Sequence, residues 1–525
     1  MPFRFIYLIR FALFLTAGAI FVLLRASSTG DEIARTPLQL DTAPAASWTS
    51  EELKRDPNII VVLSEAFWDP TVIPGLTFSR DPIPTFHALQ QKYTNGWMLS
   101  PQFGGGTANV ELEVLTGNSM RFLPEDSIAY EEFIKHDVDS MASILARQGY
   151  TSTAISPFYN WYFDSSNVYR HFGFSRFISF EYFNPNEYVG PYIGDHAVAK
   201  RIIEESERST GSDFIFANTM ENHYHYWPNK FKKNTIDIKG NMSGEALGIL
   251  ETYAQGANGA DAMLQELVEH YSRVKEPTIL VFFGDHLPSL EKEFVYRESK
   301  YISGEDDPDY LEKMHRTPVL VWDNYLNHGK DSLQISPSFL SPYVLELAQR
   351  KGSTYTDFLH ELSRKIPVIP PKAYYEAYHI READLTEYEQ RQQQILFGVG
   401  DSAEPVKPPI GKDPNFISGY GDPAIRSVAP DHLQAGEGGL VADLKKSVTL
   451  TVKGGRYGIA SVVFADGKPL QTEWHNEETL TASLPKEMMM GPGNLQLDVR
   501  VVDEKYNVLG QSPPYPLQIK DKKEK

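Results

Sequence analysis

Two unbroken apolar runs, far apart in the chain, most constrain what it can fold into. The first covers residues 59–63 and is followed closely by Glu65. The second covers residues 279–283 and is followed closely by Asp285 and His286. A short run that is apolar at every position is typical of a strand buried on both faces, as in a parallel sheet. Such strands are joined by helices, so we expect strands and helices to alternate.

The rest of the first 400 residues follows this alternation. Helices are expected at residues 138–148, 197–205, 253–271, 342–349 and 384–398, and further strands at residues 151–155, 213–218 and 318–322. Alternation over about 300 residues indicates an α/β fold, with one sheet covered by helices on both faces. We assign this domain to residues 57–398.

The amino terminus indicates export. Arg4 and Arg10 precede the apolar run 11–24, and Arg25 closes it. Counted from residue 5 the segment has about 20 residues, which suffices to span a bilayer, whereas the shorter core is typical of a signal peptide. Residues 1–28 are thus a membrane anchor or signal segment. We favour a single-pass anchor in the cytoplasmic membrane, with the α/β domain at the cell surface or in the periplasm.

Two further stretches differ in composition from the α/β domain. Residues 29–56, rich in Ser, Thr, Ala and Pro, are predicted to be a linker, and the Pro, Gly and Asp content of residues 399–424 predicts a second linker. Residues 425–520 carry short β patterns and are predicted to form a small β-sandwich. Residues 466–470 and 480–485 give it a resemblance to bacterial immunoglobulin-like (Ig-like) modules, which act as spacers or bind glycans and partners.

The overall charge and the absence of cysteine exclude several functions. The 525 residues carry a formal net charge of −19, which argues against a general binder of nucleic acid or of anionic membranes. An acidic chain of this kind is suited to divalent cations. With no cysteine, the protein has no disulfide, no Cys-ligated zinc, no iron–sulfur cluster and no catalytic thiol.

A glycine-rich segment ends at a threonine that begins a predicted helix. Three consecutive glycines at 104–106 precede Thr107, and Gly117 is a plausible helix stop. Thr107 would then lie at the positive end of a helix dipole, where backbone N–H groups favour an anion. Its hydroxyl is either a simple N-cap or a nucleophile directed at a phosphoryl group.

The carboxyl ends of the two buried strands would bring a set of metal ligands together. Ligands of open α/β sheets bind beyond the carboxyl ends of the strands, where Glu65, Asp285, His286 and Thr107 are expected. Two carboxylates and one imidazole suit Mn²⁺, Mg²⁺ or Zn²⁺. A metal there would lower the pKa of the Thr107 hydroxyl. Alternatively, Asp285 only caps a turn.

Four motifs together resemble the lipoteichoic acid synthase and phosphoglycerol transferase branch of the sulfatase/alkaline phosphatase superfamily. They are residues 63–70, 103–117, 222–223 and 283–288. The resemblance implies a metal-bound threonine nucleophile that takes phosphoglycerol from phosphatidylglycerol and passes it to an acceptor hydroxyl. By position, Glu65, Thr107, Asp285 and His286 match the metal ligands, with manganese typical, and His223 matches the histidine that contacts the phosphoglycerol.

The loop after the strand at 213–218 supports His223 on separate grounds. It leaves the carboxyl end of that strand, so His223 can hold a phosphate oxygen or protonate a leaving alkoxide. His225 is a second candidate for the same role, or a surface histidine. The aromatic side chains of this loop either line an acceptor or lipid groove or anchor the loop.

The segment 156–169 departs from the family. Ser156, Phe163 and Ser165 stand where a histidine, a tryptophan and an arginine would grip the glycerol phosphate. Loss of the arginine removes a bidentate phosphate contact, which leaves the transferred head group open. Trp161 either replaces part of the lost aromatic wall or packs in the interior.

These observations predict a metal-dependent, membrane-anchored phosphoglycerol-type transferase with a phospholipid donor and an envelope glycan or glycolipid acceptor. The alternatives are a phosphodiesterase or phosphoethanolamine transferase of the same superfamily, and a non-catalytic protein that binds envelope glycan. A sulfatase is disfavoured because formylglycine is made from Cys or Ser, and residue 107 is Thr.

Overall fold

The computed structural model describes residues 48–49, 51–291, 293–326, 329–398, 416–435 and 447–521. The predicted anchor at 1–28, most of the linker at 29–56 and most of the linker at 399–424 lie outside these residues. Within the described part of the chain, no helix combines the length and the apolar character that a bilayer crossing requires.

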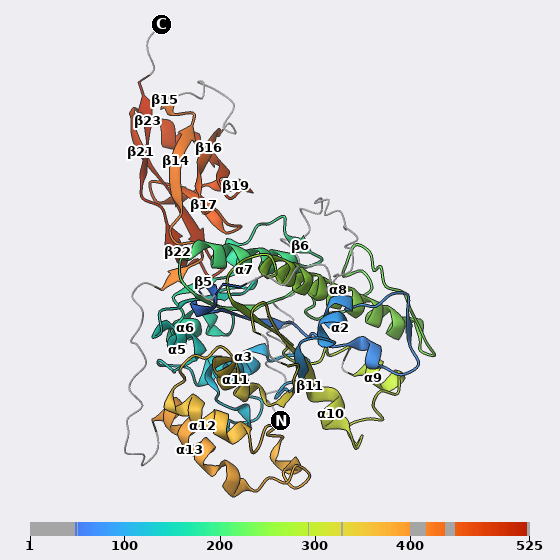
Figure 1. Cartoon of the computed structure of the whole chain (residues 1–525). Coiled ribbons are helices and arrows are strands. Elements are labelled where there is room, and N and C mark those ends of the chain that lie inside the picture. Colours follow the sequence, from blue (N-terminus) through green and yellow to red (C-terminus); the bar gives the residue numbers. More distant parts are fainter. Residues whose placement is uncertain are drawn as a thin grey trace. The chain divides into compact units, whose positions relative to one another are not determined.

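A nine-stranded sheet forms the centre of the first 400 residues (Figure 1). Its strands, in spatial order, are β12 (Ser332–Ile335), β3 (Thr94–Leu99), β11 (Arg316–Asp323), β10 (Thr278–Gly284), β1 (Asn58–Ser64), β8 (Asp213–Asn218), β4 (Thr151–Ile155), β5 (Arg176–Ile178) and β13 (Ile417–Ser418). Only β11 runs against its neighbours, β10 and β3. The predicted α/β sheet is therefore confirmed, and one of its strands is antiparallel.

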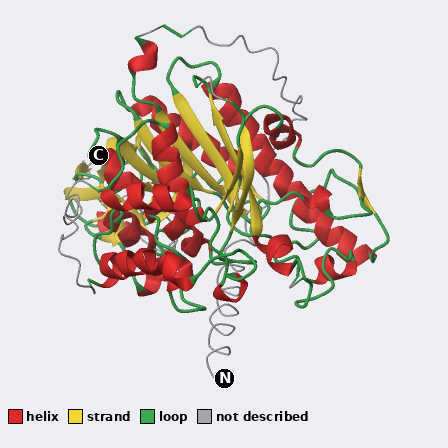
Figure 2. Cartoon of the chain, turned by 60° about the horizontal axis from the view of Figure 1, so that its bottom comes forward, coloured by secondary structure: helices red, strands yellow, loops and turns green. Residues whose placement is uncertain are grey.

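Helices cover both faces of this sheet, as Figure 2 shows. One face packs against α3 (Thr107–Thr116), α5 (Met141–Ala146), α11 (Leu340–Leu347) and α13 (Glu382–Phe397). The other packs against α2 (Pro84–Gln90), α7 (Asp195–Arg208) and α8 (Gly244–Tyr271). The remaining helices are α4 (Ala129–Glu132), α6 (Ser165–His171), α9 (Phe294–Glu298), α10 (Tyr310–His315) and α12 (Thr354–Ser363).

The central strand β1 explains why the apolar run has no polar position. Its side chains alternate between the two faces: Ile59, Val61 and Leu63 belong to one apolar core, and Ile60 and Val62 to the other. All seven residues of β1 are buried. Full burial of each such side chain contributes about 1.5–3 kcal/mol, so both faces depend on this strand.

The register of the central strands determines where the functional edge lies. In the parallel pair β1 and β10, Ser64 lies opposite Gly284, and in the pair β1 and β8, Leu63 lies opposite Asn218. The three strands thus end at the same level. The residues that follow them leave the sheet side by side at one edge.

The structure extends the predicted elements in several places. Helix α8 begins nine residues before the predicted 253, because Ser243 caps it by accepting a hydrogen bond from the Ala246 N–H. Strands β3 and β12 were not predicted, since β3 begins with Thr94, Asn95 and Gly96 rather than with an apolar run. Gly117 ends α3 with φ of 73°, as its position predicted.

The C-terminal residues form two further sheets around one apolar core. One sheet contains, in spatial order, β14 (Ala424–Ala429), β16 (Val448–Gly455), β20 (Thr479–Leu484) and β19 (Gln471–Asn476). The other contains β15 (His432–Gln434), β23 (Tyr515–Lys520), β21 (Gly493–Val502), β17 (Ser461–Ala465) and β18 (Lys468–Pro469). Strand β22 (Val508–Gln511) pairs with β21 in this second sheet. The β-rich character is as predicted. The Ig-like assignment and the domain boundaries stay predictions.

Two small pairs of strands lie outside the large sheets. Strands β2 (Thr77–Phe78) and β9 (Ile238–Lys239) pair with each other, as do β6 (Tyr188–Val189) and β7 (Tyr192–Ile193). Both pairs involve loops near the functional edge of the sheet. Strand β13 comes from within the predicted second linker and extends the central sheet beside β5.

Candidate active site

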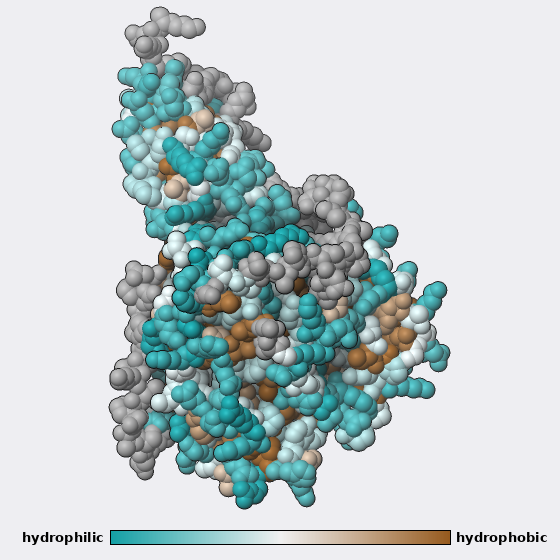
Figure 3. Space-filling model, in the orientation of Figure 1, coloured by the Kyte–Doolittle hydropathy of each residue, from teal (hydrophilic) through white to brown (hydrophobic). Residues whose placement is uncertain are grey.

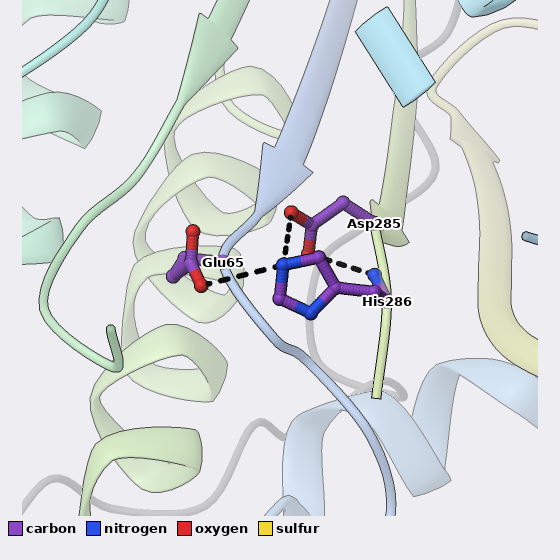
Figure 4. A group of neighbouring side chains, drawn as sticks. All are labelled: Glu65, Asp285 and His286. Carbon is purple, nitrogen blue, oxygen red and sulfur yellow. Dashed lines mark hydrogen bonds and ion pairs between the residues drawn. The ribbon is translucent and has the colours of Figure 1, made fainter. Parts of the chain in front are cut away.

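Three potential metal ligands converge where β1 and β10 end (Figure 4). Glu65 follows β1 directly, and Asp285 and His286 follow β10. The His286 Nε2 atom lies 3.8 Å from Glu65 Oε1 and 3.2 Å from Asp285 Oδ2. One ligand atom from each of the three residues lies within 4.8 Å of the others, and all three side chains are buried. The predicted convergence is therefore present.

Thr107 joins this cluster from the third predicted segment. The glycines before it have positive φ, 65° at Gly104 and 89° at Gly106, which turns the chain sharply into α3. A φ of 89° strains any residue that carries a Cβ, so position 106 favours glycine. The Thr107 hydroxyl donates to Asp285 Oδ2 at 2.8 Å, and it is therefore directed at the cluster.

Backbone groups hold the cluster in place. Asp285 Oδ1 accepts hydrogen bonds from the N–H groups of Ala66, at 2.8 Å, and His286, at 2.9 Å. The His286 Nδ1 atom lies 3.0 Å from the Leu287 carbonyl. A carbonyl only accepts, so this bond puts the proton on Nδ1 and leaves the Nε2 lone pair facing the two carboxylates, as a metal ligand requires.

A divalent cation would balance the charges in the cluster. Burial, together with the negative charge of Asp285, raises the pKa of Glu65 well above its ordinary value, while Lys230 opposes the shift. Two carboxylates at this separation in a buried site repel each other. Two carboxylate oxygens, an imidazole nitrogen and a hydroxyl form a donor set that fits a divalent cation such as Mn²⁺, Mg²⁺ or Zn²⁺.

His223 lies at the same edge in the loop after β8. Its Nδ1 atom is 2.9 Å from the Tyr224 carbonyl, and the Tyr192 hydroxyl lies 3.2 Å away. Burial, together with the charges of Lys230 and His286, lowers the pKa of His223 to about 4, although its hydrogen bond to the Tyr224 carbonyl opposes the shift. The ring is therefore neutral at pH 7. Its proton is on Nδ1, facing the carbonyl, and Nε2 carries the lone pair.

Lys230 is a cation at the site that sequence reasoning missed. Its Nζ donates to the His223 carbonyl at 2.5 Å and lies 5.1 Å from the centre of the Tyr226 ring. Burial lowers its pKa to about 7, against the charges of Glu221, Glu65 and Asp195. The available signal was its position, seven residues after His223 in a loop that leaves the carboxyl end of a strand.

The other two predicted substrate residues lie outside the three-residue cluster. The His225 ring stacks on Trp227 with ring centres 4.3 Å apart, and its Nδ1 lies 3.8 Å from Glu291. Trp161 stacks on Tyr159, and the Nζ of Lys505 lies 4.0 Å from its ring centre. Neither contact assigns a substrate, so the roles of Trp161 and His225 stay predictions.

Glu111, one turn after Thr107 on α3, is a second residue that was missed. Its carboxylate accepts hydrogen bonds from Tyr130 (2.9 Å), Tyr169 (2.6 Å) and the Asn218 amide (2.8 Å). It therefore ties the helix that carries Thr107 to the end of β8. Burial raises its pKa to about 7, although these three hydrogen bonds oppose the shift.

Comparison with known proteins places these features in context. The family model described as Sulfatase matches residues 57–350. A putative cyclic beta-1,2-glucan modification protein of Rhizobium meliloti (strain 1021) is 38% identical over 334 residues, covering 63% of this chain and 50% of the relative. A lipoteichoic acid synthase of Staphylococcus saprophyticus is 24% identical, covering 47% of this chain and 38% of the relative. The chain thus spans about half the length, or less, of these curated relatives.

One solved structure is similar over most of its own length. The Streptococcus pyogenes phosphoglycerol transferase GacH, in complex with sn-glycerol-1-phosphate, aligns with a TM-score of 0.54 and 26% identity. The alignment covers 66% of this chain and 87% of that one.

Replacement of Glu111 by glutamine should remove a pH-dependent part of the stability. The folded carboxyl has a pKa of about 7, whereas the unfolded value is about 4.3. The folded protein thus holds an extra proton between these values. The contribution of Glu111 to stability falls by about 3 kcal/mol as the pH rises from about 4.3 to 7.

Glutamine does not titrate, so E111Q should gain thermal stability relative to the wild type across this pH window. Melting temperatures of the two proteins at pH 4.5, 5.5, 6.5 and 7.5, in buffers containing a chelator, test this. A difference in Tm that stays constant over the window would contradict the raised pKa.

Proposed function

The chain belongs to the sulfatase family, and it is a member of the alkaline phosphatase superfamily that resembles lipoteichoic acid synthases and phosphoglycerol transferases; from this premise we propose that it is a metal-dependent phosphotransferase. The donor is an anionic phospholipid such as phosphatidylglycerol, and the transferred unit is a phosphoglycerol-type group. The acceptor is a hydroxyl of an envelope glycan or glycolipid. The reaction takes place outside the cytoplasmic membrane, to which the predicted N-terminal segment anchors the protein.

One observation carries this proposal: the Thr107 hydroxyl is hydrogen-bonded to Asp285 beside Glu65 and His286. These four residues would hold the cation, with manganese the ion favoured by the resemblance. When bound, the cation would lower the pKa of the Thr107 hydroxyl and offset the charge of the phosphate oxygens. A merely structural threonine would be the N-cap of the helix, but here Gly106 is the N-cap of α3 and Thr107 is its first residue.

The reaction has two balanced steps. In the first, Thr107 Oγ attacks phosphorus, the bond from phosphorus to the diacylglycerol oxygen breaks, and the proton lost by Thr107 ends on diacylglycerol. In the second, the acceptor hydroxyl attacks the phosphoryl-threonine, the bond from Thr107 Oγ to phosphorus breaks, and the acceptor proton returns to Thr107. A positioned base and a preorganised site assist both steps.

His223 is suited to receive a proton first and to give it up afterwards. Its neutral ring carries the lone pair on Nε2, because Nδ1 faces the Tyr224 carbonyl. It can therefore accept the proton of the incoming acceptor hydroxyl and pass it to the oxygen of Thr107. This arrangement supports a role as base toward the acceptor, followed by protonation of the leaving Thr107 alkoxide, which is one of the two roles that the sequence suggested.

Lys230 supplies the positive charge that the segment 156–169 lacks. Ser165 stands where the family arginine would be. It is the first residue of α6, and its hydroxyl donates a hydrogen bond to the Tyr162 carbonyl. The Lys230 ammonium lies within electrostatic reach of Glu65 and donates one hydrogen bond to the His223 carbonyl. Its other N–H groups can bind an oxygen of the phosphate or of its head group.

The names of the relatives support the choice of acceptor. They concern a glucan modification protein, lipoteichoic acid synthases and a phosphoglycerol transferase bound to sn-glycerol-1-phosphate. One name refers to a glucan, one to lipoteichoic acid and one to phosphoglycerol transfer, which supports a glycan or glycolipid acceptor and a phosphoglycerol-type group for this chain. Hydrolysis by water, and transfer of phosphoethanolamine instead, are the outcomes against which this proposal is tested.

Replacement of Thr107 by alanine should abolish release of diacylglycerol from labelled phosphatidylglycerol, because no nucleophile remains. T107S should retain part of the activity, since it keeps a hydroxyl. Mass spectrometry of the Thr107 peptide should reveal a phosphoglycerol adduct in the wild type.

Turnover by T107A would overturn the assignment of Thr107 as the nucleophile. Release that does not require an added glycan acceptor would indicate a phosphodiesterase, and an adduct with the mass of phosphoethanolamine would change the head group.

Removal of divalent cations should inactivate the protein and lower its Tm, because the carboxylates of Glu65 and Asp285 then face each other without a counter-charge. Added Mn²⁺ should restore both properties, since an ion that binds only the folded state stabilises it. The metal titration of Tm should be lost in D285N. Full activity and an unchanged Tm in the chelated protein would exclude the metal role.

Replacement of Lys230 by glutamine should lower kcat/KM for the phospholipid donor by about 10- to 100-fold, as expected for loss of a charged hydrogen bond of about 1.5–3 kcal/mol. The effect should lie mainly in KM, and K230R should recover most of it. The exposed Lys365 provides the control variant, K365Q, which should behave as the wild type. Equal losses in K230Q and K230R, accompanied by equal losses of Tm, would indicate a structural role only.

A further inference from the structure

The loop after β8 carries an unusual charge for this protein. Residues 228–242 contain Lys230, Lys232, Lys233 and Lys239 and a single acidic residue, Asp237. The chain as a whole has a net charge of −19. The segment is therefore a local positive region in an acidic protein, and it begins next to the active-site histidine.

The lysines divide into one that turns inward and three that face solvent. Lys230 points to the His223 carbonyl, as described above. Lys232, Lys233 and Lys239 are exposed, and none of them pairs with a carboxylate within the part of the chain that the structure describes. Their charges are thus available to a partner outside the molecule.

Apolar side chains lie beside these lysines. Trp227, at the start of the segment, is 53% exposed, and Val72, in the loop before β2, is 49% exposed. Strands β2 and β9 pair so that Thr77 lies opposite Lys239, and a Cβ on Gly240 would lie 2.3 Å from Leu76. Residues 76–78 of the first loop therefore lie side by side with residues 238–240 of the second.

The hydropathy of the surface agrees with this description. Figure 3 shows apolar side chains gathered over the region where α9 and the adjacent end of α8 lie in Figure 1. Phe294, at the start of α9, is 36% exposed, and Met242, just before α8, is partly exposed. We call the surface formed by residues 72–78 and 227–242 the basic face.

We propose that the basic face docks on the surface of an anionic phospholipid bilayer, which presents the donor lipid to the active site. This inference rests on the proposed function and names the surface that the donor occupies before transfer. Lysines near an anionic leaflet each contribute about 1 kcal/mol, and an exposed tryptophan is suited to the level of the lipid head groups. The complementary charge is the reason to choose a bilayer rather than a neutral glycan.

The same loop connects the bilayer surface to the chemistry. Trp227 stacks on His225, two residues after His223, and Lys230 lies between the exposed Trp227 and the exposed Lys232 along the chain. A head group attracted by the outer lysines would thus meet Lys230 and His223 next. Besides Asp237, the carboxylate of Glu291 also lies near this loop, 3.8 Å from His225 Nδ1.

The absence of cysteine allows a direct test with the full chain. A single cysteine, Asn229→Cys, placed in the exposed part of the loop and labelled with a polarity-sensitive dye, reports contact with lipid. A second labelled protein, Glu361→Cys on α12, is the positional control. Both carry Thr107→Ala, so that no turnover occurs, and both are reconstituted into vesicles of phosphatidylcholine alone or with 30% phosphatidylglycerol.

The dye at residue 229 should report an apolar environment in the vesicles with phosphatidylglycerol and not in the neutral ones, while the dye at residue 361 should report water in both. K232Q/K233Q should weaken the lipid-dependent signal by about 30-fold in apparent affinity for phosphatidylglycerol. Salt at 1 M, where the screening length is about 3 Å, should abolish it. The matched control, K351Q/K365Q, should leave it unchanged.

Three outcomes would overturn the inference: equal signals in neutral and anionic vesicles, no effect of K232Q/K233Q, or a signal that follows a soluble envelope glycan instead of lipid. Binding is measured without catalysis, so the result is independent of the proposed reaction. A normal lipid signal with no transfer in the wild type would refute the proposed function alone. Transfer from detergent-dispersed donor without any lipid signal would refute the basic face alone.

Discussion

The parallel pairing of β1 and β10 is the constraint on which the rest of the structure depends. Because Ser64 lies opposite Gly284, the next residues of both strands, Glu65 and Asp285, leave the sheet at the same level. Two buried carboxylates are thereby forced into one small volume, at a cost that only a cation or protonation can offset. The cores on both faces hold the two strands in this register, and the repulsion cannot be relieved by a shift of one strand.

The sequence predicted those parts of the site that lie directly at the ends of buried strands. Glu65, Asp285 and His286 follow runs whose pattern is unambiguous, and Thr107 follows three glycines that permit a sharp turn. In each case the local sequence determines where the side chain must lie relative to the sheet. The same reasoning predicted β8, β4 and the two-faced sheet, since apolar runs of this kind have few alternative environments.

What the sequence did not reveal depends on contacts between distant segments. Lys230 lies in a long loop, and only its packing against Tyr226 and its bond to the His223 carbonyl direct it to the site. Glu111 resembles any polar residue on a helix, and its role comes from Tyr130, Tyr169 and Asn218, which are separated from it by 19, 58 and 107 positions. The direction of β11 likewise depends on its neighbours and not on its own residues.

The distribution of charge links the site to its surroundings. A chain with a net charge of −19 repels an anionic surface over most of its area, so approach is favourable only where positive charge is concentrated. The loop that supplies this concentration is also the loop that carries His223 and Lys230. A neutral His223 beside a cationic Lys230 is consistent with one loop that serves two purposes: its outer lysines set the orientation of the protein on lipid, and its inner residues handle the phosphate and the proton. The long-range attraction would then act on a head group first, and the short-range chemistry would act on the same head group afterwards.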